Sequence, residues 1–309
     1  MYIFIINPKA GSGRALKVFS DIQNSAVYRQ MDSQYFFTEY EGHGEAIARK
    51  ISADPEGKTI IVVGGDGTIH EVMNGLISTE IRIAFIPAGS GNDFARGCGI
   101  KGKPEEILRK IIEHNMVRPY WIGNYTADGY GVHKFVNSIG FGFDAAIAHA
   151  ANQSSYRRFL NALGLGTLSY VIALIYVLMY YKPMSMELEI DNEKRILKDC
   201  WMVTIANHPY YGGGMKIIPT AVIQPNVFPL LIIHSISKWK VLALFITVFL
   251  GIHTRFKEVE ILEATTLKIT AETSIPFQTD GQTGKCSSSL ISKQKEAVHI
   301  TGINEAWAK

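Results

Sequence analysis

The fold of the first part of this chain is decided by one stretch, Ile60-Ile61-Val62-Val63-Gly64-Gly65-Asp66-Gly67-Thr68. Its four β-branched residues predict a buried strand, and the glycines that follow allow a sharp turn into a helix. Glycines also let the backbone approach a ligand closely, and amides at a helix start can hold phosphate oxygens. A purely structural explanation is a tight turn in which Thr68 and Glu71 form a capping box. The two explanations use different donors, and an exposed acid among three glycines favours a phosphate site.

The segments around this stretch alternate between short runs of β-forming residues and polar segments with a helical period. Strands are expected at Tyr2–Ile6, Tyr35–Thr38, Thr59–Val63 and Arg82–Ile86, and helices at about Arg14–Ala26, Gly44–Ser52, Thr68–Ser78 and Pro104–His114. Such alternation predicts a parallel, doubly wound α/β sheet, in which ligands bind at the carboxyl ends of the strands.

Two further glycine-rich loops follow strands of this expected sheet. The first, Asn7–Arg14, supplies glycines, a hydroxyl and two cations, but it is not a Walker A loop because its lysine precedes the glycines. The second is Pro87–Arg96, which reads PAGSGNDFAR. Either loop alone could be an ordinary turn. Three such loops after strands of one sheet predict a nucleotide site at its carboxyl edge.

The pattern changes at about Tyr120, where longer strand-like runs with turn signals begin. These runs are His133–Ile139, Ser185–Ile190, Asp199–Ala206 and Leu230–His234, and two apolar helices are expected at Leu168–Tyr181 and Val241–Ile252. Long strands joined by turns predict a mostly antiparallel β domain. We therefore expect residues 1–125 to form an α/β domain and residues 126–296 a mostly β domain.

The composition excludes several classes of protein. The chain has 309 residues, of which 47% are hydrophobic, and this is enough for two domains with proper cores. The formal charge of +3 is far below that of a nucleic-acid-binding protein, although it permits a mild attraction to anionic lipid surfaces. The three scattered cysteines are typical of a reducing compartment.

The expected location of the protein follows from its amino terminus and its apolar runs. The amino terminus predicts a buried strand and no signal peptide, and neither apolar helix reaches the roughly 20 residues that cross a bilayer. We therefore expect a cytoplasmic protein with peripheral contact to a membrane. The sequence leaves the oligomeric state open, a homodimer included.

Several motifs together resemble the diacylglycerol kinase catalytic-domain family, which contains bacterial lipid kinases related to sphingosine kinases. In chain order they are Asn7-Pro8 with Gly11 and Gly13, Gly64–Thr68 with Glu71-Val72 and Asn74-Gly75-Leu76, Asn92–Arg96, Asn207–Lys216 with Pro219, and Asp280-Gly281. The resemblance covers essentially the whole chain and is most specific before residue 100. It implies a Rossmann-like first domain, an antiparallel β-sandwich second domain and ATP between them. It also implies that the carboxyl-terminal tail, residues 297–309, returns to the first domain.

The resemblance further implies roles for single residues. Nucleotide contacts would come from Asn7, Lys9, Gly11, Ser12, Gly13, Thr38, Gly64, Gly65, Gly67, Thr68, Glu71 and Ser90. Asp66 would act beside the phosphates or through Mg²⁺ carried with ATP, and Asp280 would lie near the transferred phosphoryl. Asp93 and Asp144 would orient the lipid headgroup. Without the resemblance, Asp144 is equally well explained as the N-cap of a helix at Ala145–Ala151, and Asp280 as a turn residue.

The chain also departs from the family pattern. It has His70 for asparagine, Ser90 for threonine and, two residues after Asp280, Gln282 for a glutamate. An amide has no useful basicity, so Gln282 could only orient the acceptor hydroxyl, and slow turnover is expected. Asp66, or Asp280 from the same face of an extended segment, could substitute as the base.

A second departure concerns metal binding. The segment 220–229 has no carboxylate, whereas family members carry aspartates there that resemble a structural magnesium site. Magnesium usually takes at least one carboxylate ligand, so no metal held by the protein is expected at this segment.

Three hypotheses of function result. The first is an ATP-dependent kinase that phosphorylates a hydroxyl of diacylglycerol or a similar membrane lipid. The second is NAD kinase, whose family shares the Gly-Gly-Asp-Gly-Thr loop, although Asn74-Gly75-Leu76 and Asn92-Asp93-Phe94 favour the lipid branch. The third is a catalytically weak nucleotide-binding protein, for which Gln282 and the segment 220–229 argue.

Overall fold

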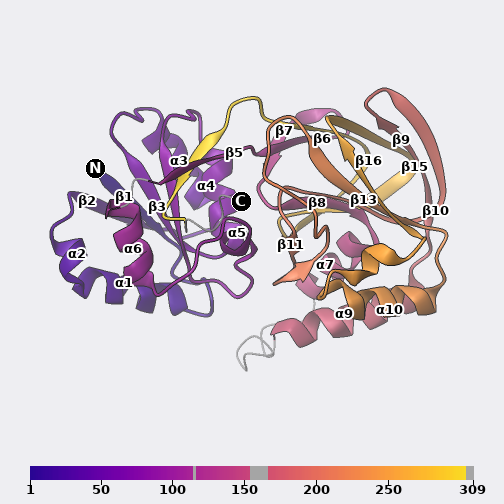
Figure 1. The fold of residues 1–309 in the computed structure, drawn as a ribbon, viewed down its shortest axis with the longest axis horizontal. Helices are drawn as coiled ribbons and strands as arrows, with labels where there is room; N and C mark the ends of the chain where they lie inside the picture. Colours follow the sequence, from indigo (N-terminus) through magenta and orange to yellow (C-terminus); the bar gives the residue numbers. More distant parts are fainter. Residues whose placement is uncertain (114–115, 154–165, 304–309) are drawn as a thin grey trace. The chain divides into compact units, whose positions relative to one another are not determined.

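The computed structural model describes residues 1–113, 116–153 and 166–303, and the chain divides into two compact units (Figure 1). The first unit comprises Met1–Ile122 together with the chain from Glu296 onward. The second unit comprises Gly123–Lys295.

The first unit contains one six-stranded sheet flanked by helices, in the strand order β2-β1-β3-β4-β17-β5. Its strands are β1 (Tyr2–Ile6), β2 (Ser33–Phe37), β3 (Thr59–Gly64), β4 (Arg82–Pro87), β5 (Val117–Tyr120) and β17 (Val298–Thr301). Its helices are α1 (Arg14–Asn24), α2 (Ala26–Arg29), α3 (His43–Ser52), α4 (Asp66–Gly75), α5 (Asp93–Gly97) and α6 (Pro104–Glu113). All neighbouring strands are parallel except β17 and β5, so the predicted parallel, doubly wound sheet is confirmed.

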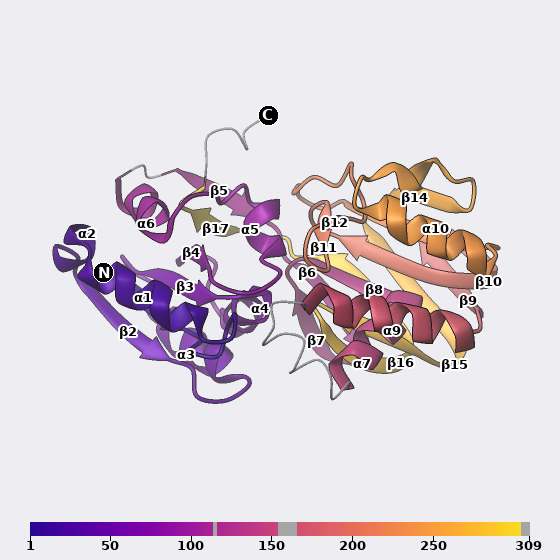
Figure 2. The same ribbon diagram turned by 90° about the horizontal axis from the view of Figure 1, so that it is seen from below.

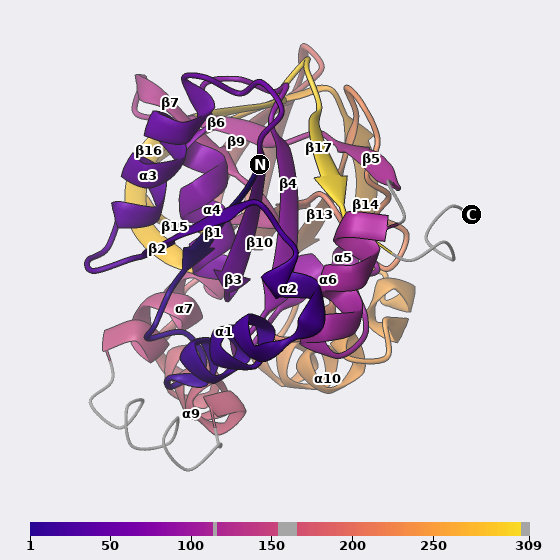
Figure 3. The ribbon, with the colours of Figure 1, turned by 90° about the vertical axis from the view of Figure 1, so that its left-hand side faces the viewer.

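The central strands of this sheet are buried because helices cover both faces. All six residues of β3 are buried, as expected for a parallel strand between two helical layers. Helices α1, α2 and α6 pack together on one face, and α3 packs on α4 on the other (Figure 3). The edge strand β2 is mostly exposed.

The strand β17 comes from the end of the chain and lies inside the sheet of the first unit. It pairs in parallel with β4, where His299 lies opposite Arg82, and antiparallel with β5, where Val298 lies opposite Tyr120. Figure 3 shows it in yellow beside β4. By pairing on both sides, β17 covers the edge that β4 would otherwise present.

The second unit is built on antiparallel strands. They are β6 (Gly123–Ala127), β7 (Tyr130–Phe135), β8 (Ser138–Gly142), β9 (Met184–Ile190), β10 (Glu193–Ala206), β11 (Tyr210–Tyr211), β12 (Met215–Lys216), β13 (Phe228–His234), β14 (Val259–Ala264), β15 (Thr266–Thr279) and β16 (Gln282–Lys293). Its described helices are α7 (Phe143–Gln153), α9 (Gly166–Tyr180), α10 (Lys238–Val248) and the 3-10 turn η1 (Ile252–Arg255).

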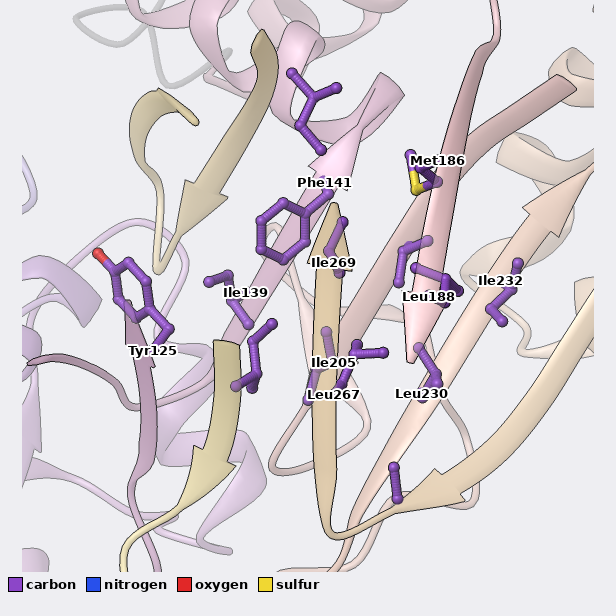
Figure 4. Packing of buried hydrophobic residues seen from close by; sticks show 14 of the residues in the cluster. Tyr125, Ile139, Phe141, Met186, Leu188, Ile205, Leu230, Ile232, Leu267 and Ile269 are labelled. Atoms are coloured by element: carbon purple, nitrogen blue, oxygen red, sulfur yellow. The ribbon is translucent and has the colours of Figure 1, made fainter. Parts of the chain in front are cut away.

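Two long strands turn this sheet into a sandwich. The first parts of β10 and β15 both pair with β9, and their later parts both pair with β8. Side chains of β8 and β9, such as Phe141 and Leu188, enter the same hydrophobic core (Figure 4). Because the two halves face each other across one core, the predicted antiparallel β-sandwich is confirmed.

The outer face of β10 and β13 carries a second core beneath the helices. Leu230 and Ile232 of β13 point into the sandwich, whereas Leu231 and Ile233 point to the opposite face. This alternation is the period of two that a strand imposes on its side chains. The buried sides of α9 and α10 pack on this outer face. No helix among the described residues is long and apolar enough to cross a membrane.

Three local predictions were wrong. The expected strand His133–Ile139 is two strands, because β7 ends at Phe135 and β8 begins at Ser138. The capping box of Thr68 and Glu71 does not form, since α4 begins at Asp66 and has Gly65 as its N-cap. Asp144 is not an N-cap either, because it is the second residue of α7.

Candidate active site

The three glycine-rich loops of the first unit lie side by side at the carboxyl edge of its sheet. The N–H of Asn7 donates to the carbonyl of Val63 at 3.0 Å, and the N–H of Ala88 donates to the carbonyl of Gly64 at 2.7 Å. Each loop therefore continues the ladder of its strand by one residue before it turns away. This places the loops after β1, β3 and β4 against one another, as the sequence predicts.

The loop after β1 has three consecutive residues with positive φ, Gly11 at 58°, Ser12 at 56° and Gly13 at 90°. A Cβ at Gly11 would overlap the carbonyl oxygen of Ala88, so glycine is required there. A Cβ at Gly13 would meet open space. Lys9 and Ser12 are exposed in the same loop.

Asn7 joins this loop to helix α4. Its Nδ2 donates to the Thr68 hydroxyl at 3.1 Å, and its Oδ1 accepts from the N–H of Lys9 at 3.0 Å. The side chain of Asn7 thus fixes the course of the loop. It also engages the Thr68 hydroxyl in a hydrogen bond within the protein.

The loops after β3 and β4 touch through their glycines. A Cβ on Gly65 would lie 3.1 Å from the Cα of Gly89. Asn92, with φ of 56°, closes the second loop, since its Oδ1 accepts from the N–H of Gly89 and its Nδ2 donates to the carbonyl of Gly89, both at 2.9 Å. Gly67 faces open space at the start of α4, and Ser90 is exposed.

The acid of the central turn is bonded to the neighbouring loop. Oδ1 of Asp66 accepts from the N–H of Phe94 at 2.9 Å, and the Asp66 side chain is half-buried. Asp93 is buried and forms an ion pair with Arg96 at 2.8 Å, while Arg96 also donates to the carbonyl of Gly91. The structure therefore places Asp66 and Asp93 at one edge, on neighbouring loops.

Thr38 and Glu71 have structural contacts. The N–H of Thr38 donates to the carbonyl of Ile6 at 2.8 Å, and its side chain is buried. Oε2 of Glu71 accepts from the N–H of Gly44 at 3.0 Å, at the amino-terminal turn of α3, where the helix dipole favours an anion. These contacts hold β2 and α3 against the rest of the unit.

In the second unit, Asp280 forms the turn between β15 and β16. Asp280 and Gly281 have φ of 49° and 91°, the positive values of a two-residue type I′ hairpin. Oδ2 of Asp280 accepts from the N–H of Val136 at 2.6 Å, and Oδ1 accepts from the N–H groups of Asn137 and Ser138 at 2.7 and 3.0 Å. The carboxylate thus holds the point where β7 passes into β8.

Gln282 begins β16 and is exposed. The expectation that Asp280 and Gln282 share one face of an extended segment was wrong. The chain reverses between them, and Gln282 pairs with Thr279 on the other strand of the hairpin.

The buried His208, which no sequence pattern indicated as a site residue, supports the turn at Asp280 through Asn137. Nδ1 of His208 accepts from the N–H of Tyr210 at 3.3 Å, so Nε2 carries the proton and donates to Oδ1 of Asn137 at 2.9 Å. Burial lowers the pKa of His208 to about 4, so the ring is neutral near pH 7. Its position between Asn207 and Pro209, inside a family motif, was the available signal.

Asp144 lies in a polar cluster on the outer face of the sandwich. Thr204 of β10 and Gln278 of β15 both lie opposite Gly140 of β8, one on each side, so the three residues form one row across the sheet. The Asp144 carboxyl covers Gly140, where a Cβ would overlap it, and accepts from the Thr204 hydroxyl at 3.3 Å. Burial raises the pKa of Asp144 to about 6.

The segment 220–229 contacts a buried lysine, Lys293. Nζ of Lys293 donates to the carbonyl of Gln224 at 2.6 Å, and burial lowers the pKa of Lys293 to about 8. Across the described parts of the chain, no group of three or more histidine, cysteine or acidic side chains is placed to hold a metal ion.

Comparisons with known proteins agree with this arrangement. Residues 1–123 match the family model of the diacylglycerol kinase catalytic domain, and residues 137–298 match that of the YegS C-terminal NAD kinase beta sandwich-like domain. A relative from Bacillus subtilis (strain 168), named "Putative lipid kinase YtlR", is 35% identical over 91% of this chain and 93% of its own length.

Two more distant proteins extend the comparison. A protein of Mycobacterium tuberculosis (strain ATCC 25618 / H37Rv), named diacylglycerol kinase, is 28% identical over 86% of this chain and 83% of its own length. A crystal structure of a diacylglycerol kinase from Bacillus anthracis str. Sterne has the same fold, with a TM-score of 0.69 and 19% identity over 99% of this chain and 97% of that chain.

The order of the glycine loops, the sandwich domain and these similarities over nearly the whole length lead to one conclusion. The chain belongs to the diacylglycerol kinase catalytic-domain family of lipid kinases.

Proposed function

We propose that this protein is an ATP-dependent kinase that phosphorylates a hydroxyl of diacylglycerol or a similar membrane lipid. The observation that carries the proposal is the convergence of three glycine loops at one sheet edge, with Gly65 and Gly89 in backbone contact. The names of the relatives, lipid kinase and diacylglycerol kinase, support the class of acceptor.

The first unit would bind the nucleotide. Gly13 and Gly67 leave open space at the amino-terminal ends of α1 and α4, where backbone N–H groups and the helix dipole favour phosphate. Lys9 and Ser12 are exposed beside them and can add a cation and a hydroxyl. Catalysis of phosphoryl transfer depends mainly on such positioning and neutralisation of charge.

The donors at this edge fit Mg²⁺ that arrives with ATP. Magnesium in kinases is usually held by one or two carboxylates together with phosphate oxygens, and Asp66 supplies a half-buried carboxylate at the turn. When bound, the ion would neutralise part of the charge on the phosphates. The protein's own contribution is to fix Asp66 through the N–H of Phe94.

The acceptor would be oriented by acids. Asp93 and Asp144 are the candidates for the lipid headgroup, and Asp280 is the candidate beside the transferred phosphoryl. Asp280 already accepts three backbone N–H groups, so its oxygens are less available to take the proton of the acceptor. Gln282 has an amide in place of a carboxylate and cannot act as the base either. The lack of an effective base at both residues favours slow turnover.

The test is to incubate the protein with radiolabelled ATP and a total lipid extract, and to identify the lipid that acquires label. Label in one lipid species is expected, and NAD offered in parallel without lipid should stay unlabelled. Labelled NAD would instead establish the second hypothesis. Binding of ATP with no labelled acceptor of any kind would establish the third, a nucleotide-binding protein without transfer.

A further inference from the structure

Helix α9 is apolar on two opposite sides. Leu174, Val177 and Leu178 face the core beneath the helix. The exposed residues follow the spacing of the other side of a helix and are Ile172, Ile175, Tyr176, Met179 and Tyr180. A helix with apolar residues on its solvent side presents a surface that water solvates poorly, and such patches mark sites of interaction.

Helix α10 repeats this arrangement. Val241, Leu244 and Val248 are buried in the same core. Its outer side carries Trp239, which is 82% exposed, and Ile246, which is 68% exposed, and Phe249 and Leu250 continue the patch beyond the helix end. A tryptophan so exposed keeps most of its surface in contact with water.

The two helices present their outer sides on one face of the second unit. Nζ of Lys238, at the start of α10, donates to the carbonyl of Met179, near the end of α9, at 2.7 Å. Figure 1 shows both helices along the lower edge of the unit, and Figure 2, which views it from below, shows them turned toward the viewer. We call the exposed apolar residues of α9 and α10, with Phe249 and Leu250, the helical face.

The charges at the helical face are cationic. Neither α9 nor α10 contains an aspartate or glutamate. Lys182, Lys238 and Lys240 are exposed close in sequence to Tyr180 and Trp239. Lys240 forms an ion pair with the buried Glu258 at 2.6 Å, so the positive charge of the face comes from Lys182 and Lys238. The face therefore combines aliphatic side chains, aromatic side chains and lysines.

We propose that the helical face docks the protein on an anionic lipid bilayer. Aliphatic residues enter the boundary of the acyl chains, tryptophan and tyrosine favour the interface, and lysines remain among anionic headgroups. A second copy of the chain would instead bring the same lysines and no acid on its helices to balance them. The inference deepens the proposed function and rests on it for its purpose, which is to bring the enzyme to a membrane-bound acceptor.

The test measures co-sedimentation of the full-length protein with vesicles, without ATP. The wild type should bind vesicles of phosphatidylcholine and phosphatidylglycerol in equal amounts, bind pure phosphatidylcholine more weakly, and lose binding as salt screens the lysines. The double variant Trp239→Ser with Ile246→Ser should bind the mixed vesicles at least about tenfold more weakly, because it removes two large apolar groups from the interface.

The matched control is Tyr130→Ser with Val132→Ser, which removes two apolar side chains that are 79% and 70% exposed on β7. It should bind vesicles like the wild type. Equal binding by all three proteins, or no binding by the wild type, would overturn the proposal. So would a wild-type dimer that only the Trp239 and Ile246 changes convert to a monomer, since a second copy would then cover the face.

This test separates docking from catalysis. The vesicle-binding measurements need no turnover. Vesicle binding that depends on Trp239 would therefore support the docking proposal even if no lipid is phosphorylated. Conversely, transfer to a short-chain acceptor in detergent should be the same for the double variant and the wild type, because neither substituted residue belongs to the candidate active site. Loss of that transfer would show that the helical face acts in the chemistry and not in docking.

Discussion

Gly65, in the turn after β3, lies so close to Gly89, in the loop after β4, that a Cβ on Gly89 would be 2.5 Å from the Cα of Gly65. Real side chains do not approach a backbone atom at this distance without a shift of the chain. The turn after β3 and the loop after β4 are thus held together by two glycines, and the geometry of one depends on the other.

This contact separates two kinds of glycine at the proposed nucleotide site. We expect Gly67→Val to lower ATP affinity at least about tenfold, or roughly 1.4 kcal/mol, because its side chain enters the open space at the start of α4. Its thermal midpoint should change little, since nothing lies within 4 Å of the new Cβ. Calorimetry measures the affinity and a melting curve the stability.

Gly89→Ala is the comparison. It should lose affinity and also stability, by about 1–3 kcal/mol, since the methyl group meets the Gly65 backbone. If Gly67→Val binds ATP as the wild type does, the nucleotide does not bind at this turn.

Asp280→Asn should reduce both stability and transfer. An amide retains one acceptor oxygen, whereas the carboxylate accepts from three backbone N–H groups with both oxygens. A donor left without a partner costs about 1–3 kcal/mol, measured as the free energy of unfolding in urea. Asparagine tolerates the positive φ of the turn, so the backbone should be preserved.

Asp128 offers a matched control in the equivalent Asp-Gly hairpin between β6 and β7. Among the described residues, its side chain accepts through Oδ1 alone, from the N–H groups of Ser287 and Ser288. Asp128→Asn keeps that oxygen and should leave stability and transfer unchanged. Unaltered stability of Asp280→Asn would show that its three hydrogen bonds are not what holds the junction of β7 and β8.

Gln282→Glu should accelerate transfer. A carboxylate can take the acceptor's proton, and general bases contribute about 10² to 10⁴-fold. Gln282 is exposed, so the added charge should cost little stability, and ATP affinity should stay the same. Gln34→Glu, on the exposed edge strand β2, adds the same charge elsewhere and should have no effect on rate. A Gln282→Glu enzyme no faster than the wild type means that the base lies at another residue.

Asp144 should make stability depend on pH. Burial raises its pKa from the usual 3.8 to about 6, so the folded state binds the proton more tightly than the unfolded state does. Stability therefore falls as pH rises from about 4 to about 6, by up to about 3 kcal/mol at 1.36 kcal/mol per pKa unit. Asp144→Asn removes this titration and should be the more stable protein at pH 7.

The measurement is the difference in unfolding free energy between Asp144→Asn and the wild type across that pH range. The difference should grow in favour of the variant as pH rises. A difference that is independent of pH would mean that the buried carboxyl does not titrate in this window. Transfer by the variant should fall if Asp144 orients the headgroup.

The sequence by itself determined the sheet of the first unit and its three loops. Runs such as Ile60–Val63 and the glycines after them act over a few residues, so local pattern is enough to place β3, the turn and α4 in order. The parallel arrangement then brings the loops to one edge. The strand pattern also predicted a mostly antiparallel second domain, because long strands separated by turn signals are readable locally. That this domain is a β-sandwich was implied only by the family resemblance.

Only the tertiary structure decided the contacts between distant parts of the chain. Val298 lies opposite Tyr120, and Asp280 holds the N–H groups of Val136 and Asn137. It also showed that Thr68 is held by Asn7 and does not cap a helix. The hydrogen bond between the neutral His208 and Asn137 is another contact between distant parts of the chain. A local pattern determines the period of each helix or strand. Strand pairing and the hydrogen-bond partners of carboxylates depend instead on which surfaces meet after folding. Any backbone N–H can serve as the donor to a carboxylate, so the sequence alone does not identify the partner.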